Sequence, residues 1–175
     1  EESLINEIKK FDRQPYNIYF IFNELKDATN GLPQINKFLR GAKAISDKNI
    51  KYRRWLFLDF DPIREGDVKD IASSDEETER AHQMALDVRR FLIQRGFKQP
   101  IVCFSGNGYH ELYRIDNIEC TDEVDNDIKN FLAYIADKFN NKYVDCDLKN
   151  KNASRLTKFY GSTSHKGGNR FHGFL

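Results

Sequence analysis

The sequence predicts an α+β fold built from one sheet and two amphipathic helices. Three observations favour this fold: an apolar segment at 55–61 that ends in aspartates, two long stretches with helical spacing of apolar residues, and a Gly-Asn-Gly turn between two strand-like segments. The 175 residues are 39% hydrophobic and 13% aromatic, which is enough to bury a core in one domain of ordinary size.

The first part of the chain is predicted to hold a short helix and one strand. Residues 3–11 fit a helix, and residues 16–22 fit a strand because they are rich in aromatic residues and isoleucine. The Gly-Leu-Pro sequence at 31–33 predicts a break, and a weaker helical pattern follows at 34–44. A basic segment then leads into the aspartate-bearing strand at 55–61.

Two amphipathic helices carry most of the helical signal. The first begins at Ser73-Ser74-Asp75, where a hydroxyl can cap the helix and acids lie at the positive end of its dipole, and Gly96 ends it. The second begins at Thr121. Each has apolar residues at helical spacing along one side: Ala81, Met84, Ala85, Val88, Phe91 and Leu92 in the first, and Val124, Ile128, Phe131, Leu132, Ile135, Ala136 and Phe139 in the second.

Short strands are predicted before and after the second helix in the sequence. Residues 100–105 are predicted to pair with 109–115 across a tight glycine turn. An extended segment opens at 143–145, and 155–160 either continues it or forms the next strand. From residue 54 onward the order is strand, helix, strand, strand, helix, strand, which is the split βαβ plan (βαββαβ) of ferredoxin-like and RRM-like folds.

This plan brings three distant segments to one edge of the sheet. Its first and third strands are antiparallel neighbours at the centre, and the fourth flanks the first on the other side. Asp59 and Asp61, at the end of the first strand, are therefore expected beside His110 at the start of the third and Asp145 at the start of the fourth.

Asp59 and Asp61 are candidate metal ligands. Residues two apart on a strand point to the same face, and paired carboxylates can share a hard divalent cation such as Mg²⁺ or Mn²⁺. Asp145 is the expected third ligand, and Asp147, on the same strand face, is an alternative to it. One or two cations would offset the mutual repulsion of such a cluster. A plainer interpretation is that Asp61-Pro62 ends a strand and enters a turn.

The segment 105–110, Ser-Gly-Asn-Gly-Tyr-His, is a candidate phosphate site. Gly106, Asn107 and the next glycine would leave backbone N–H groups free to approach an anion closely. Ser105 would add a hydroxyl and His110 an imidazole donor, which together suit a triphosphate beside a metal ion. The alternative is an ordinary hairpin turn followed by a structural histidine.

A third candidate segment, 152–161, supplies cations. Arg155 can hold phosphate oxygens as a fork and Lys158 as a point charge, and Asn152 belongs to the same segment. Strand parity places Arg155 and Lys158 on opposite faces, so a bend or bulge is needed for both to reach one ligand. The alternative is a half-exposed strand with ordinary basic residues.

Composition excludes several classes of function. The formal net charge of +1 excludes a uniformly basic polyanion binder, but it allows a local basic patch offset by acidic helices. No apolar run has membrane-spanning length, and no secretory signal is visible. Three widely spaced cysteines without a Cys-x-x-Cys pair argue against a disulfide framework or a zinc ribbon and predict a cytoplasmic protein. The start at Glu-Glu predicts a fragment of a larger protein.

In this order, the three motifs resemble those of the archaeo-eukaryotic primase superfamily, the primase-polymerases. The family's hydrophobic-Asp-x-Asp motif matches 56–61, its small-x-His motif is similar to 105–110, and its hydrophobic-Asp motif matches 144–145. The Asn-x-Ser-Arg-hydrophobic-x-basic-x-x-Gly pattern of plasmid and phage members resembles 152–161. By this resemblance, residues 51–175 are an RRM-like catalytic palm, and residues 1–50 are the variable N-terminal α/β module of the same core.

The resemblance implies template-dependent nucleotidyl transfer, the reaction of a primase or polymerase. Two Mg²⁺ or Mn²⁺ ions would be held by Asp59, Asp61 and Asp145. The incoming NTP or dNTP would be bound by Ser105, Gly106, Asn107, His110, Asn152, Arg155 and Lys158. The implied partners are a single-stranded DNA template with its primer, and a helicase or other domain outside this fragment. The zinc motif of replicative primases is missing, so no zinc is expected within this fragment. The resemblance points to phage, plasmid, mobile-element or CRISPR-associated relatives, or to a zinc module outside this fragment.

Two other functions fit part of the pattern. A haloacid-dehalogenase-type phosphatase also begins with a hydrophobic strand and Asp-x-Asp, with Asp59 as nucleophile and Asp61 as acid or base. That family favours Thr or Val where this chain has Ile63, and it needs parallel strands rather than a hairpin. A non-catalytic RRM-like module would display paired aromatics such as Phe57 and Tyr113, but it would gain nothing from the two aspartates.

Overall fold

The computed structural model describes residues 2–12, 14–26, 45–64, 71–166 and 169–172. The predicted break at 31–33 and the predicted helix at 34–44 lie outside these residues. None of the helices within the described ranges is long and apolar enough to span a bilayer.

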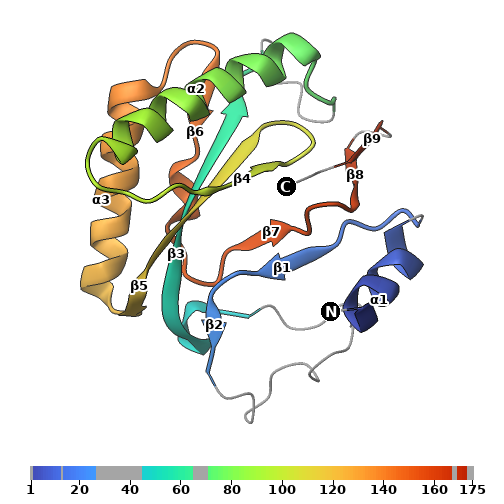
Figure 1. The fold of residues 1–175 in the computed structure, drawn as a ribbon, viewed down its shortest axis with the longest axis horizontal. Helices are drawn as coiled ribbons and strands as arrows, with labels where there is room; N and C mark the ends of the chain where they lie inside the picture. The colour runs from blue at the N-terminus through green and yellow to red at the C-terminus, as the bar shows by residue number, and fades with distance from the viewer. Residues whose placement is uncertain (1, 13, 27–44, 65–70, 167–168, 173–175) are drawn as a thin grey trace.

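An antiparallel sheet forms the centre of the molecule (Figure 1). β3 (Ile50–Pro62) pairs along its length with β5 (Tyr109–Glu119), and β4 (Ile101–Phe104) pairs with the other edge of β5. β2 (Glu24–Leu25) and β6 (Val144–Cys146) pair with opposite ends of β3. The spatial order β6-β3-β5-β4 is the order of the βαββαβ plan, so the predicted α+β fold is confirmed.

The register of the sheet brings the predicted segments together. Asp59 lies directly opposite His110 in the β3–β5 pair, and Asp61 lies opposite Asp145 in the β3–β6 pair. Residues that face each other across antiparallel strands point to the same side of the sheet. The convergence expected from the order of the elements is therefore present in the backbone.

Two helices pack against the same face of the sheet. α2 (Asp75–Ile93) begins as predicted, with a reciprocal capping box between Ser74 and Glu77, and α3 (Asp122–Phe139) begins after Thr121, whose hydroxyl accepts a hydrogen bond from Val124 N–H. Their apolar sides pack with Leu58 and other strand residues in the larger core. Because side chains alternate along a strand, the residues of β3 on either side of Leu58 face away from the helices.

A two-stranded ribbon lies on the other side of the sheet from the helices (Figure 1). β1 (Tyr19–Ile21) pairs antiparallel with β7 (Leu156–Lys158), so one predicted strand is shorter than 16–22 and the other does not continue β6. The remaining elements are α1 (Glu2–Asp12), β8 (Thr163–Lys166), β9 (Asn169–His172), and the short 3-10 helices η1 (Asp47–Asn49) and η3 (Leu148–Lys151). The ribbon places segments from both ends of the described chain beside the aspartate-bearing strand.

Candidate active site

The two aspartates of β3 face away from the helical core. Leu58 and Phe60 have no exposed surface because they pack under the helices, and the alternating positions 59 and 61 therefore point to the opposite side. Asp59 is buried with 7% of its surface exposed, whereas Asp61 is exposed near the end of the strand. Both carboxylates line the same pocket.

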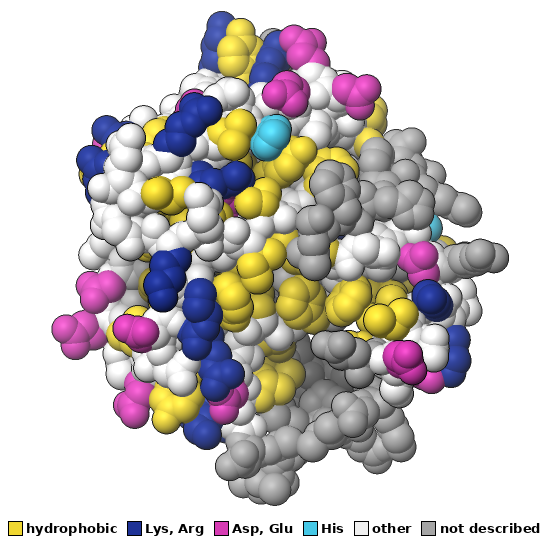
Figure 2. Space-filling view, in the orientation of Figure 1, with side chains coloured by type: hydrophobic (Ala, Val, Ile, Leu, Met, Phe, Trp, Pro, Cys, Tyr) yellow, Lys and Arg dark blue, Asp and Glu magenta, His cyan; other side chains and the backbone are white. Residues whose placement is uncertain are grey.

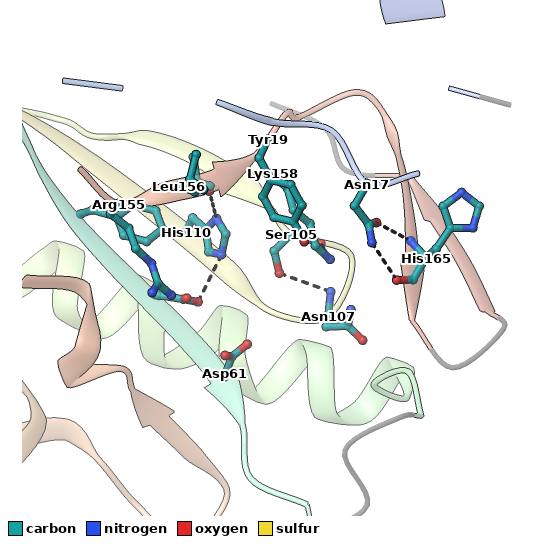
Figure 3. Close-up of a pocket in the computed structure, with 13 residues that line it drawn as sticks. Asn17, Tyr19, Asp61, Ser105, Asn107, His110, Arg155, Leu156, Lys158 and His165 are labelled. Carbon is teal, nitrogen blue, oxygen red and sulfur yellow. Dashed lines mark hydrogen bonds and ion pairs between the residues drawn. The ribbon is translucent and has the colours of Figure 1, made fainter. Parts of the chain in front are cut away.

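This pocket has a volume of about 320 Å³ and lies between the sheet and the β1–β7 ribbon (Figure 3). A volume near this value is at the small end of the range for ligand sites. The pocket collects seven of the residues predicted from the sequence: Asp59, Asp61, Ser105, Asn107, His110, Arg155 and Lys158. Carboxylates and cations thus meet in one hollow, as a metal–triphosphate site requires.

Asp59 and His110 form the buried centre of the pocket. Asp59 Oδ1 lies 3.2 Å from His110 Nε2, and Asn150 Nδ2 is 3.5 Å from Asp59 Oδ2. Burial alone would raise the pKa of Asp59, but the neighbouring His110 ring outweighs it, with help from Arg155 and Asn150. The pKa of Asp59 is therefore held below its usual value, and the carboxylate stays ionised.

The His110 ring is fixed from its other side by the ribbon. Its Nδ1 lies 2.6 Å from the Tyr160 hydroxyl and 3.4 Å from Thr157 Oγ1, and these two hydroxyls are 3.2 Å apart. Phe57 packs against the ring edge-on, with centroids 4.9 Å apart. Burial raises the pKa of Tyr160 above its usual value, so the phenol keeps its proton. His110 is thus positioned with Nε2 directed at Asp59.

The glycine turn before His110 is closely packed. Gly106 has a φ of 89°, which favours glycine, and the Ser105 hydroxyl accepts a hydrogen bond from Gly108 N–H at 3.0 Å. Asn107 N–H lies 3.4 Å from the same hydroxyl. The expectation that these amides are free for an anion is wrong for positions 107 and 108, because both point to Ser105 Oγ. Phosphate contacts from this turn would require Ser105 to exchange partners.

The side chain of Asn107 ties the same turn to the beginning of α2. Its Oδ1 accepts a hydrogen bond from Ser73 N–H at 3.1 Å, and Ser73 Oγ donates to the Asn107 carbonyl at 2.7 Å. The Asn107 side chain therefore anchors the turn, and Asn107 also lines the pocket.

Arg155 and Lys158 reach the pocket together, although strand parity argued against it. Arg155 precedes β7, so the alternation of the strand does not apply to it, and its guanidinium lies 3.6 Å from Asp147 Oδ2. Lys158 Nζ donates to the Ser105 carbonyl at 3.4 Å and also to Ser164 Oγ. The bend expected from strand parity is therefore unnecessary, because β7 begins only after Arg155.

Three predicted residues do not line the pocket. Asp145 faces Asp61 across the β3–β6 pair, but it is exposed and its carboxylate accepts a hydrogen bond from the Asn140 side chain. Burial, and then the charge of Asp147, raise the pKa of Asp145. Asn152 is exposed and donates to Asp47 Oδ2 at 3.2 Å. Gly106 shapes the turn without forming part of the pocket wall.

Besides Phe57 of β3, five residues of the pocket wall were not predicted as site residues. They come from the ribbon and the segments that flank it: Asn17, Tyr19, Leu156, Thr157 and His165. The Asn17 side chain pairs with the His165 backbone in both directions, at 2.8 and 3.3 Å, which joins the segment before β1 to β8 (Figure 3). Leu156 and Thr157 lie within the candidate segment 152–161, but the local sequence does not mark Asn17, Tyr19 or His165, which the pairing of β1 with β7 brings nearby.

A divalent cation fits this end of β3 by the chemistry of its donors. Asp59 and Asp61 present carboxylate oxygens to one pocket, and Asp59 Oδ1 already has His110 Nε2 at 3.2 Å as a neighbour. Within those ranges, however, no three acidic, histidine or cysteine side chains are grouped closely enough to hold an ion together. Asp145, the third candidate, would have to release Asn140 to complete the ligand set.

No protein-family model and no curated protein matches the sequence. Among solved structures, the chain is similar to the polymerase domain of ligase D from Mycobacterium tuberculosis, solved in complex with DNA, with 15% identity and a TM-score of 0.48. The similarity covers 73% of this chain and 45% of the other, so this chain spans less than half the length of that structure. The function of this chain is therefore inferred from the residues of its pocket.

Proposed function

We propose that the protein is a primase-polymerase that transfers nucleotides to a growing strand on a single-stranded DNA template. The observation that carries the proposal is one pocket in which Asp59 and Asp61 face Arg155 and Lys158. Carboxylates suit a divalent cation, and the two basic side chains suit the phosphates of an NTP or dNTP. A pocket for an uncharged ligand has no use for both sets of charges.

The pocket residues would have distinct tasks. Asp59 and Asp61, with Asp145 once it leaves Asn140, would hold Mg²⁺ or Mn²⁺, which when bound activates the attacking 3′-hydroxyl and neutralises the leaving pyrophosphate. Arg155 and Lys158 would bind and orient the triphosphate on the ribbon side.

His110 would donate to a phosphate oxygen rather than act as a base. Its Nδ1 is held by the Tyr160 and Thr157 hydroxyls, so Nε2 is the nitrogen that faces the pocket. A ring fixed in this way presents an N–H donor without reorganising during the reaction. Ser105 and Asn107, on the neighbouring turn, would exchange their present hydrogen-bond partners for the same phosphates.

The double variant Asp59→Ala with Asp61→Ala tests the proposal. Wild-type protein is expected to extend a primer on single-stranded DNA when Mg²⁺ or Mn²⁺ and nucleoside triphosphates are present, and the double variant is expected to be inactive but folded. Asp137→Ala, an exposed aspartate of α3, is the matched control and should retain wild-type activity. Strand synthesis by the double variant at the wild-type rate would sink the proposal.

The sheet topology disagrees with the phosphatase alternative. That alternative needs parallel strands, whereas β3 is antiparallel to β2, β5 and β6. Release of phosphate from a small phosphomonoester, in the absence of nucleic acid, would nevertheless favour the phosphatase.

A further inference from the structure

A second hollow, of about 390 Å³, is lined by residues of β3, β4 and β5 on one side and by residues of the ribbon and its flanks on the other. We call it the aromatic groove. Its wall contains five half-buried aromatic side chains, and the described residues that line it include no charged group: the aromatics are Phe20, Phe22, Trp55, Phe159 and Tyr160. A soluble protein rarely leaves so many aromatic rings at one opening without a binding role.

The aromatic groove shares a wall with the candidate active site. Tyr160 lines the groove with its ring, and its hydroxyl lies 2.6 Å from Nδ1 of His110, which lines the pocket. Phe57 joins the same wall, because it packs against His110 on one side and Phe22 on the other. A planar group in the groove would therefore lie one side chain away from the pocket.

Positive charge borders the aromatic groove. The Arg114 guanidinium lies 5.8 Å from the Trp55 ring centroid and donates to the Arg54 carbonyl at 2.9 Å. Arg54 and Lys51, on the neighbouring part of β3, pair with the same carboxylate, Glu24. Figure 2 shows a column of Lys and Arg side chains over the lower part of β3, next to a band of hydrophobic side chains that crosses the middle of this face.

We infer that the aromatic groove binds the bases of a single-stranded nucleic acid, the strand that the proposed polymerase activity would use as its template. Unpaired bases stack on aromatic side chains, and their phosphates need cations alongside, which is the combination found here. An apolar protein segment would use the rings but would gain nothing from Arg114 and its neighbours. That this strand is the template rests on the proposed function. That the groove binds a single strand does not.

Trp55 makes the inference directly measurable. It is the single tryptophan of the chain and it lines the aromatic groove, so a base stacked there should quench the intrinsic fluorescence. A labelled oligothymidylate is titrated into the protein in EDTA, without nucleoside triphosphate, while Trp55 fluorescence and the anisotropy of the label are recorded. The fluorescence is expected to fall with the same midpoint at which the anisotropy rises.

Variants of the groove should weaken this binding. Phe20→Ala is expected to raise the Kd roughly fivefold to a hundredfold, the range for losing one base–aromatic stack. Tyr134→Ala, a half-exposed aromatic on α3, is the matched control and should leave the Kd unchanged.

Ile101 separates an effect on the groove from an effect on folding. Its side chain lines the groove, and 44% of the residue is exposed, so either charge is tolerated there. Ile101→Glu should raise the Kd about fivefold by repelling phosphates, whereas Ile101→Lys should leave it equal or lower. Equal weakening by both variants would overturn the inference.

The remaining outcomes also decide the matter. Oligothymidylate that binds by anisotropy without quenching Trp55 would place the strand elsewhere, and an absence of binding would refute the groove as a strand site. An apolar dye that binds in the groove and is not displaced by oligothymidylate would instead indicate an apolar protein partner. Strand binding with quenching, in a wild-type protein that extends no primer, would refute the proposed function and leave the groove intact.

Discussion

Replacing Gly108 with alanine is the sharpest test of how the site is built. The Cβ of an alanine at this position would lie 2.2 Å from the Phe60 carbonyl oxygen and 3.1 Å from Asp61 Oδ1. Because Cβ atoms essentially never come closer than 3.0 Å to such neighbours, the turn and β3 would have to separate by at least about 0.8 Å. That displacement occurs between the two strands that carry Asp61 and His110.

The expected loss of activity follows from this distance. A misplacement of about 1 Å can reduce an enzymatic rate about a hundredfold, so Gly108→Ala should lower kcat/KM for nucleotide incorporation by about that factor. Overpacking of this kind should also reduce the free energy of unfolding by about 1–3 kcal/mol. Primer extension under single-nucleotide conditions measures the first quantity, and chemical denaturation measures the second.

Gly96→Ala is the matched control for this variant. Gly96 has a φ of 91°, and apart from its chain neighbours no atom of the described residues lies within 4 Å of an added Cβ, so the substitution strains only the backbone after α2. It should cost about 1–2 kcal/mol of stability and leave kcat/KM unchanged at a temperature where the variant is folded. Wild-type kcat/KM in Gly108→Ala, or an equal loss in Gly96→Ala, would refute the reasoning.

Three further variants test other contacts. Tyr160→Phe removes the hydroxyl beside His110 Nδ1, which should lower the incorporation rate about tenfold and shift the ¹⁵N resonances of the His110 ring; an unchanged ring spectrum would contradict this. Arg89→Met leaves the fully buried Glu111 without its cation and should cost about 3–5 kcal/mol near neutral pH by urea denaturation. Because burial raises the pKa of Glu111, the folded state binds its proton more tightly than the unfolded state, and this loss should shrink as the pH falls through that raised pKa; a loss independent of pH would argue against it. Ser74→Ala should lower the free energy of unfolding by about 1 kcal/mol through loss of the α2 cap, and an unchanged thermal midpoint would count against that role.

Local signals in the sequence predicted much of the fold. The capping residues Ser74 and Thr121 begin α2 and α3 as expected, because a cap depends only on residues within one helical turn. The hairpin and the antiparallel order of the sheet followed from the sequence of elements, and with them the positions of Asp59 and Asp61 beside His110 and Asp145.

The rest of the pocket depends on contacts that local patterns do not contain. β1 pairs with β7 across most of the chain, so neither Tyr19 nor Thr157 could be recognised as a pocket residue from its neighbours in sequence. The contact between Tyr160 and His110 has the same origin. The bond from Asn140 to Asp145 joins the end of α3 to β6 and depends on the exact path of the connecting turn.

The β1–β7 ribbon also affects the order in which the parts of the pocket form while the chain is synthesised. A nascent chain that has emerged as far as β6 contains every strand of the central sheet and both of its helices. It has not yet made β7, so β1 has no partner and the basic wall of the pocket does not exist. Since chains fold from the N-terminus as they are made, the sheet with its aspartates can form before Arg155 and Lys158 join the pocket. A chain truncated before Arg155 would therefore lack both basic residues of the pocket.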